Sequence, residues 1–298
     1  MPSLADLAQL VRAPAALSVP GDVVAGAAAA EALDHRVPGL AGASVLLYWA
    51  GMAANDWADR ELDARERPER PIPSGRISPG VALGVSAGLT AAGVALAGVT
   101  GGRRALAVAV PLAGAVWAYD LRAKNTAAGP ALMAVCRGLD VLLGASQGRT
   151  ARAVPAALTV AAHTYTVTEL SRREVSGASR ALPAATLAGT AAVAAAAVVG
   201  SRAGARAVPD RPLARPGWRT LVPAVLAGWY GLQYGAAQAR VAADPQASRV
   251  RAAVGAGITG LPALQGALVA RAGAALLGVA VAAAAPLGRR LARKVSPT

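Results

Sequence analysis

The feature that most constrains this chain is a series of long apolar runs with few charges. A run of ~20 apolar residues is long enough to cross a bilayer as a helix. With 55% apolar and only 15% charged residues, the chain could not cover a water-facing surface of ordinary composition. We therefore predict an all-α integral membrane protein, a bundle of about nine transmembrane helices in a single domain over residues 1-298. The predicted spans lie near residues 13-31, 39-55, 79-99, 105-119, 130-147, 154-170, 181-200, 218-238 and 253-285.

Two of these predicted spans contain signs of a break. Pro20 and Gly21 interrupt the first, and the last is long enough to be tilted, broken or two elements. Before the first span, Leu4, Leu7 and Leu10 fit one face of a short helix lying on the membrane, and we expect this N-terminal segment to be retained.

The net charge of +14 comes almost entirely from arginine. Its arginines are scattered over the connections between spans, which argues against a nucleic-acid partner and favours anionic membrane lipid and phosphate-bearing substrates. Basic residues divide evenly between the two sides of the predicted bundle, so charge alone does not fix its orientation. A connection over residues 201-219 carries many of the arginines that fall on the side opposite the N-terminus.

An unusual concentration of charge follows the second predicted span, in "NDWADRELDARERPERPIPSGRIS". If the span continues as a helix, Asn55, Asp59 and Asp63 share one face, with Asp56 beside them. Grouped carboxylates repel one another unless a cation intervenes, and hard oxygen ligands suit Mg²⁺. The alternative is a solvated helix end whose acids pair with arginines at i,i+4, as in Glu61/Arg65 and Asp63/Arg67.

The residues after the acidic cluster are rich in proline and arginine. Three prolines and a Ser-Gly pair predict rigid turns, and Arg70 and Arg76 are fixed donors suited to a phosphate group. Acidic cluster and basic turn together predict a site for a metal ion and a phosphorylated ligand.

At these residues the chain resembles the UbiA superfamily of intramembrane prenyltransferases, with its NDxxDxxxD motif followed by an RP-x-P-S-G-x-I segment. Asn55, Asp56, Asp59 and Asp63, then Arg70 and the Pro-Ser-Gly turn, match the fixed positions, while Arg76 fills a variable one. The resemblance implies a nine-helix bundle in the cell membrane, with Mg²⁺ and an isoprenoid diphosphate bound on the cytoplasmic side. It also implies a lipophilic or aromatic acceptor for the prenyl group.

Further along the chain the resemblance is weaker. The family commonly has Tyr-x-x-x-Lys after the fourth span, whereas Tyr119 and Lys124 in "YDLRAKNT" are one residue further apart. In place of the family's second Asp-rich motif stands "TELSRREVSG", with Glu169, Arg172 and Glu174 but no aspartate. Together with "CRGLDVLLG", this segment is closer to the EboC-type branch than to the quinone-pathway enzymes.

Charged residues inside predicted spans suggest function, because a charge at the bilayer centre costs roughly 2.5–3.5 kcal/mol on insertion scales. Arg137 and Asp140 stand at i,i+3 and could form a structural salt bridge or contact substrate. Asp22 has no basic residue within a turn, so its partner must come from another helix. His163 is read as a packing residue, since no second His lies at ligand spacing.

The resulting prediction is a prenyltransferase in which Asp56, Asp59 and Asp63 hold Mg²⁺ against the diphosphate. Asn55, Arg70, Arg76, Tyr119, Lys124, Arg137, Glu169, Arg172 and Glu174 would bind substrate. Glu169 and Glu174 would assist a second Mg²⁺ or take up a proton, roles that the sequence does not separate. The altered second motif leaves two alternatives open: an intramembrane terpene cyclase and a non-catalytic lipid-binding or export component.

Overall fold

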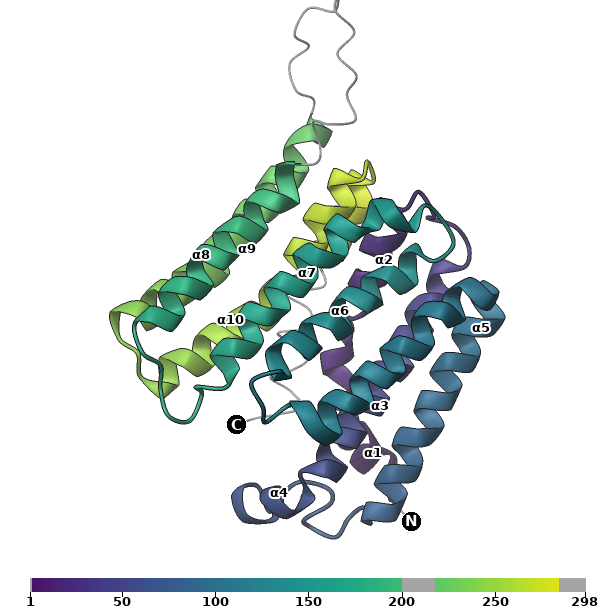
Figure 1. Cartoon of the computed structure of the whole chain (residues 1–298), viewed down its shortest axis with the longest axis vertical. Coiled ribbons are helices and arrows are strands. Elements are labelled where there is room, and N and C mark those ends of the chain that lie inside the picture. Colours follow the sequence, from purple (N-terminus) through teal and green to yellow (C-terminus); the bar gives the residue numbers. More distant parts are fainter. Residues whose placement is uncertain (1, 200–217, 284–298) are drawn as a thin grey trace, which may run out of the picture.

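The structure, a computed structural model, describes residues 2–199 and 218–283 and is all helical in these ranges. The connection at 201-219 thus lies almost wholly outside the described residues. The helices pack side by side as one bundle, with the short α4 at one end (Figure 1). In chain order they are α1 (Leu4–Leu10), η1 (Ala13–Ser18), α2 (Pro20–Ala29), α3 (Val37–Ala58), α4 (Arg60–Glu66), α5 (Pro79–Ala118), η2 (Tyr119–Ala123), α6 (Gly129–Ala145), α7 (Thr150–Ser171), α8 (Ala181–Val199), α9 (Trp218–Ala243) and α10 (Ala247–Arg271).

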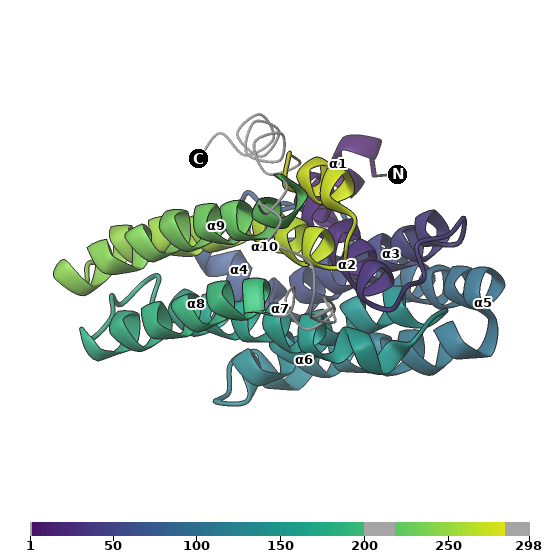
Figure 2. The same cartoon turned by 90° about the horizontal axis from the view of Figure 1, so that it is seen from above.

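Long helices that follow one another in the sequence mostly pack against one another. Helix α2 joins the two ends of this series, because it packs against both α3 and α10. In projection, α5 to α8 form one row and α9, α10, α2 and α3 a second row (Figure 2). Helix α2 touches α3, α6, α7 and α10, which places this short helix in the middle of the bundle.

Local sequence explains the breaks between helices. Pro20 starts α2 after the 3-10 turn η1, so the first predicted span is interrupted where Pro20 and Gly21 indicated. Gly102, with φ 61° and ψ −153°, breaks the helical path inside α5 and separates the predicted spans at 79-99 and 105-119. Residues 272–274 are not helical, and the chain is helical again over 275–283, so the last predicted span is two elements.

Among the described residues, four segments are long and apolar enough to cross a membrane: Val37–Ala58, Pro79–Ala123, Ala181–Val199 and Ala247–Arg271. The spans predicted near 130-147, 154-170 and 218-238 are also helical, as α6, which has 17 residues, α7 and α9, although they are not among these four segments. An all-helical membrane architecture is confirmed, and the number of crossings stays a prediction.

Small residues let the central helices approach until their backbones touch. A Cβ added to Gly26 of α2 would lie 1.8 Å from the carbonyl oxygen of Val141, and one added to Gly144 of α6 would lie 2.0 Å from that of Val23. Close contact through glycine is the usual way in which helices associate where lipid removes the hydrophobic driving force. This contact fixes α6, which carries residues of the candidate site, against the centre of the bundle.

Candidate active site

The acidic cluster lies where α3 ends and α4 begins. Asp59 is the single residue between α3 and α4, and the spacing of one turn continues across this break, because Asp59 N donates to Asn55 O at 3.0 Å and Asp63 N to Asp59 O at 2.8 Å. Asp56 and Asp63 are buried, and Asp59 is partly exposed. The predicted continuation of the second span as a nearly continuous helix is confirmed.

Each of these three carboxylates contacts a cation from another part of the chain. Nη1 of Arg70 lies 2.5 Å from Asp63 Oδ2 and 3.4 Å from Asp56 Oδ1, and Nη2 of Arg12 lies 2.9 Å from the same Asp56 oxygen. Nζ of Lys124 lies 2.6 Å from Asp59 Oδ1. The alternative of local i,i+4 pairing is wrong for Asp63, whose partner is Arg70.

A π-helical turn, η2, explains how Lys124 reaches Asp59 despite the extra residue in the sequence. The backbone N of Lys124 donates to the carbonyl oxygen of Tyr119 at 3.0 Å, which closes the i→i+5 ring that defines a π turn. The additional residue is therefore absorbed in the backbone. Tyr119 and Lys124 both remain at the end of the bundle that carries the aspartates.

Asp120, in the same turn, is a site residue that the sequence did not single out. Its carboxylate is buried and accepts a hydrogen bond from Asn55 Nδ2 at 3.2 Å. An acid directly after a tyrosine at a helix end is unremarkable as a pattern. The available signal was its position inside "YDLRAK", a segment already chosen for its tyrosine and lysine.

An apolar cavity of about 110 Å³ runs inward from Asp120. It is bounded by α3, α5, η2 and α6 and reaches the level of Val19, and Tyr48 and Met52 of α3 line its wall. Its other lining residues are Ser44, Leu47, Gly51, Leu112, Val116, Tyr119, Met133, Cys136, Arg137 and Asp140. The carboxylates and cations thus stand at one end of a narrow hydrophobic space.

A buried ionic network closes the inner end of this cavity. Arg137 Nη2 lies 2.6 Å from Asp22 Oδ2, so its partner is Asp22 on α2 and the predicted pairing with Asp140 is wrong. Gln265 Nε2 donates to the other Asp22 oxygen at 2.6 Å, and Ser44 donates to Asp140 at 2.5 Å. The reason is geometric: Gly26 and Gly144 let α2 approach α6 closely, which brings Asp22 within reach of Arg137.

The segment that replaces the second Asp-rich motif lies at the same end of the bundle. Arg172 donates to the carbonyl oxygen of Thr126, two residues beyond Lys124, and Arg251 donates to that of Glu174 at 2.8 Å. Burial raises the pKa of the Glu174 carboxyl, while nearby Arg251 and Arg67 lower it. Glu169 is partly buried on α7. The structure brings this segment next to the first motif but gives it basic neighbours.

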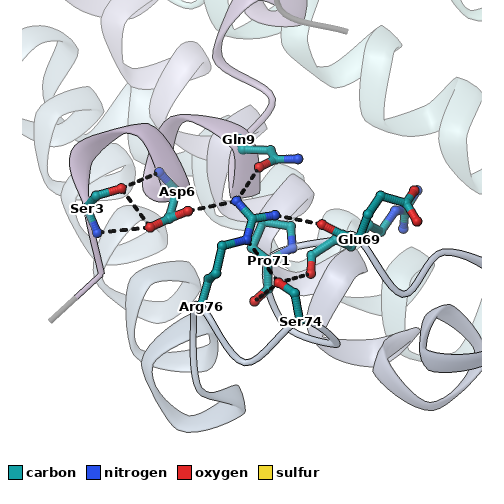
Figure 3. A network of polar contacts seen from close by, with 8 residues as sticks. Ser3, Asp6, Gln9, Glu69, Pro71, Ser74 and Arg76 are labelled. Atoms are coloured by element: carbon teal, nitrogen blue, oxygen red, sulfur yellow. Dashed lines mark hydrogen bonds and ion pairs between the residues drawn. The ribbon is translucent and has the colours of Figure 1, made fainter. Parts of the chain in front are cut away.

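Arg76 contacts α1 and its own turn instead of Asp56, Asp59 or Asp63, and Figure 3 shows these contacts. Its guanidinium donates to Asp6, Gln9 and Ser74 and to the carbonyl oxygen of Glu69, at 2.6–2.9 Å. These bonds join α1 to the turn formed by residues 67–78, the Pro-rich turn. Gly75 has φ 76° there, which explains the Ser-Gly pair.

The donor set suits a cation shared with a ligand better than a closed metal cage. Within residues 2–199 and 218–283, no three Asp, Glu, His or Cys side chains could enclose a metal ion on their own. However, Asp56 and Asp63 already direct one oxygen each at a single cationic nitrogen, Nη1 of Arg70. Mg²⁺ is commonly held by one or two carboxylates and completed by waters and phosphate oxygens. Asp56, Asp59 and Asp63 therefore fit Mg²⁺ bound together with a diphosphate.

The fold and the site define a multi-pass membrane protein whose acidic and basic groups meet at one end of an apolar cavity. The model of the UbiA prenyltransferase family matches residues 20–169, half of the chain. The chain belongs to this family of transferases.

Relatives with assigned names match over shorter segments. Digeranylgeranylglyceryl phosphate synthase from Methanopyrus kandleri is 40% identical over 100 residues, 33% of this chain and 36% of that protein. The enzyme of the same name from Halobacterium salinarum is 34% identical over 149 residues, 48% of this chain and 52% of that protein. The bacteriochlorophyll synthase 33 kDa chain of Cereibacter sphaeroides is 36% identical over 115 residues, 36% and 37% of the two chains. The matches thus span about a third to a half of these relatives, and the EboC-type assignment stays a prediction.

Solved structures share the fold over nearly the whole chain. A structure reported for digeranylgeranylglyceryl phosphate synthase in membranes superposes with a TM-score of 0.65, at 15% identity, covering 90% of this chain and 97% of that one. The apo structure of a UbiA homolog from Aeropyrum pernix K1 gives a TM-score of 0.63 at 19% identity, covering 88% and 96%.

Proposed function

We propose that the protein binds an isoprenoid diphosphate together with Mg²⁺ at the acidic cluster and transfers the prenyl group to a lipophilic or aromatic acceptor. The observation that carries this proposal is the position of the cluster at the mouth of an apolar cavity. The two halves of a prenyl diphosphate, a multiply charged head and a hydrocarbon tail, need these two environments side by side. We also propose that residues 1-298 form a single domain.

The head group would be held by charge-assisted hydrogen bonds and by the metal. Asp56, Asp59 and Asp63 would hold Mg²⁺, which supplies a positive charge that stabilises diphosphate as it leaves. Arg70 and Lys124, now paired with these carboxylates, are close enough to donate to phosphate oxygens instead. Arg172 stands beside Lys124 and adds a further positive charge at this end.

The tail would lie in the cavity, against Leu47, Met52 and Cys136. Two tyrosines, Tyr48 and Tyr119, line the same space, and aromatic faces stabilise an adjacent carbocation. The ion pair with Asp22 at the inner end gives Arg137 a structural partner, so we assign Arg137 to the floor of the cavity and not to the diphosphate.

Transfer breaks the bond between the prenyl carbon and the diphosphate oxygen and forms a bond from that carbon to a nucleophilic atom of the acceptor. The acceptor's proton needs a base. Asp120, buried between Asn55 and the cavity, is the carboxylate nearest to where the two substrates would meet. Glu169 and Glu174 remain further candidates for this proton or for a second Mg²⁺. The arginines beside Glu174 oppose a second cation there, and burial, which raises the pKa of its carboxyl, favours uptake of a proton.

The direct test is release of pyrophosphate from geranyl, farnesyl and geranylgeranyl diphosphate in nanodiscs, with and without Mg²⁺. A transferase releases pyrophosphate in quantity only when an acceptor is supplied, and the prenyl group appears in the adduct. Hydrocarbon or alcohol formed without an acceptor would identify a terpene cyclase. Binding of diphosphate without release would identify a non-catalytic lipid-binding component.

We further propose that the end of the bundle carrying the site faces the cytoplasm. The Pro-rich turn, η2 and the turn after α7 share that end, as the contacts of Lys124 and Arg172 require. Ser74→Cys and Ser176→Cys should react with an impermeant maleimide only from the cytoplasmic side, and His35→Cys at the opposite end only from outside. Native Cys136 is buried and serves as the unlabelled background. Labelling of Ser74→Cys and Ser176→Cys from different sides would exclude a shared site.

A further inference from the structure

We propose that residues 3–12 form a cover over the diphosphate site, and that Arg76 is a positioning residue that holds this cover so that Arg12 reaches Asp56. The inference rests on the proposed function. It concerns a segment that precedes the part of the chain matched by the family model.

The cover begins with a well-formed helix start. Ser3 and Asp6 cap α1 reciprocally, with Ser3 Oγ and the Asp6 carboxylate 2.6 Å apart, and each side chain accepts the other residue's backbone N–H at 3.1 Å. The second oxygen of Asp6 accepts from Arg76 at 2.7 Å, and Gln9, one turn later, accepts from the same Nη1 at 2.8 Å (Figure 3). One arginine of the Pro-rich turn therefore holds two successive turns of α1.

An apolar contact holds the far end of the cover. Leu10 is completely buried against Ile72 and Ile77 of the Pro-rich turn and Ala53 of α3, while Leu4 at the start of α1 is largely exposed. The cover is thus attached to the turn that carries Arg70 and to the helix that carries Asp56. Its position and the position of these two site residues depend on each other.

Arg12 follows directly in an uncommon backbone conformation. Its φ of 47° and ψ of 51° are left-handed, a region that residues other than glycine seldom adopt. This turn directs the guanidinium to Asp56, where Nη2 donates to Oδ1 at 2.9 Å. If a metal ion binds the Asp56 carboxylate in place of Arg12, the N–H donors of Arg12 become available to the diphosphate beside it.

Arg76 itself uses four of its five N–H donors in this arrangement, which leaves one Nη2 hydrogen for a phosphate. Its Nε, Nη1 and Nη2 atoms all donate to Ser74, α1 or Glu69. These contacts favour an indirect role, in which Arg76 acts through α1 on Arg12, over the predicted binding of the diphosphate by Arg76 itself.

The test compares Arg12→Gln, Arg76→Gln and the double variant for affinity to inorganic pyrophosphate with Mg²⁺, by titration calorimetry in detergent. Loss of one charged donor should weaken binding about tenfold or more in Arg12→Gln, and Arg76→Gln should approach that effect. Because both substitutions act through the placement of Arg12 at Asp56, the double variant should bind pyrophosphate within about twofold of Arg12→Gln. Arg249→Gln, which breaks a similar exposed pair with Asp244, is the matched control and should bind as the wild type.

Additive losses, or unchanged affinity in Arg76→Gln, would overturn the positioning role. If the wild type binds no pyrophosphate, the proposed function fails instead. A second readout does not depend on ligand: Leu10→Cys should resist maleimide in the otherwise native chain and react in the Arg76→Gln background. Rapid labelling of Leu10→Cys in the otherwise native chain would show that the cover is not held.

Discussion

Replacing Asp59 with asparagine tests the acidic cluster most directly. Asp59 is one turn from both Asn55 and Asp63, and its Oδ1 lies 2.6 Å from Nζ of Lys124. The i,i+4 positions of Asp59 are Asn55 and Asp63, neither of them basic, so its cationic partner comes from the residue that ends the π turn η2. The substitution therefore removes a proposed metal ligand and one half of an ion pair together.

The size of each effect follows from the geometry. The Lys124 side chain is 11% exposed and that of Asp59 21%, so the pair lies between an exposed one, worth about 0.2–1 kcal/mol, and a buried one, whose disruption costs about 3–5 kcal/mol. We expect a loss of about 2 kcal/mol in stability. Loss of a metal ligand should reduce turnover at least about 100-fold, equivalent to about 2.7 kcal/mol in the activation barrier.

The assay measures pyrophosphate release across a Mg²⁺ titration, with melting in detergent recorded on the same samples. Asp59→Asn combined with Lys124→Gln removes both charges, so it should melt near the wild-type temperature and stay inactive. Asp34→Asn, at the opposite end of the bundle, is the matched control for the chemical change and should keep full activity. Unaltered turnover and Mg²⁺ dependence in Asp59→Asn would refute the assignment of the acidic cluster, as would recovery of activity in the double variant.

Three further outcomes are expected. Asp22→Asn should destabilise the bundle by about 3–5 kcal/mol, measured by detergent melting, because it leaves Arg137 buried beside a neutral partner; Asp22→Asn with Arg137→Met should recover most of this loss. Cys136→Phe should fill part of the cavity and shift the preference of the enzyme toward shorter prenyl diphosphates in competition assays; detergent melting of the same variant should show that it is still folded, so that the shift comes from the smaller cavity. Glu169→Ala or Glu174→Ala should reduce turnover less than Asp59→Asn does, and equal losses would indicate a complete second metal site.

The architecture and the first motif could be predicted from sequence because both depend on local patterns. Charge-free runs mark helices wherever the solvent is lipid, and the breaks at Pro20 and in the last span follow from residue type and run length. The spacing of Asn55, Asp59 and Asp63 sets their common face as soon as the helix continues. These inferences need only the geometry of a single helix.

The partners of charged residues could not be predicted, because they come from distant parts of the chain. Arg12 and Arg70 reach Asp56 from 44 and 14 residues away, and Asp22 finds Arg137 across a glycine contact that sequence spacing does not reveal. Arg76 looked like a phosphate donor because its neighbours in the turn match the family motif. Only the fold shows that α1 lies next to it.

The π turn at Tyr119–Ala123 also bears on how such a chain can change over evolution. An inserted residue in a continuous helix rotates everything after it by about 100°, which at this point would turn Lys124 away from Asp59. Here the extra residue is taken up within one π turn, and Lys124 still pairs with Asp59. A non-helical connection over residues 124–128 separates η2 from α6, so insertions and deletions in η2 can redirect Lys124 while the packing of α6 against α2 is unchanged, which makes η2 a place where specificity can diverge at small structural cost.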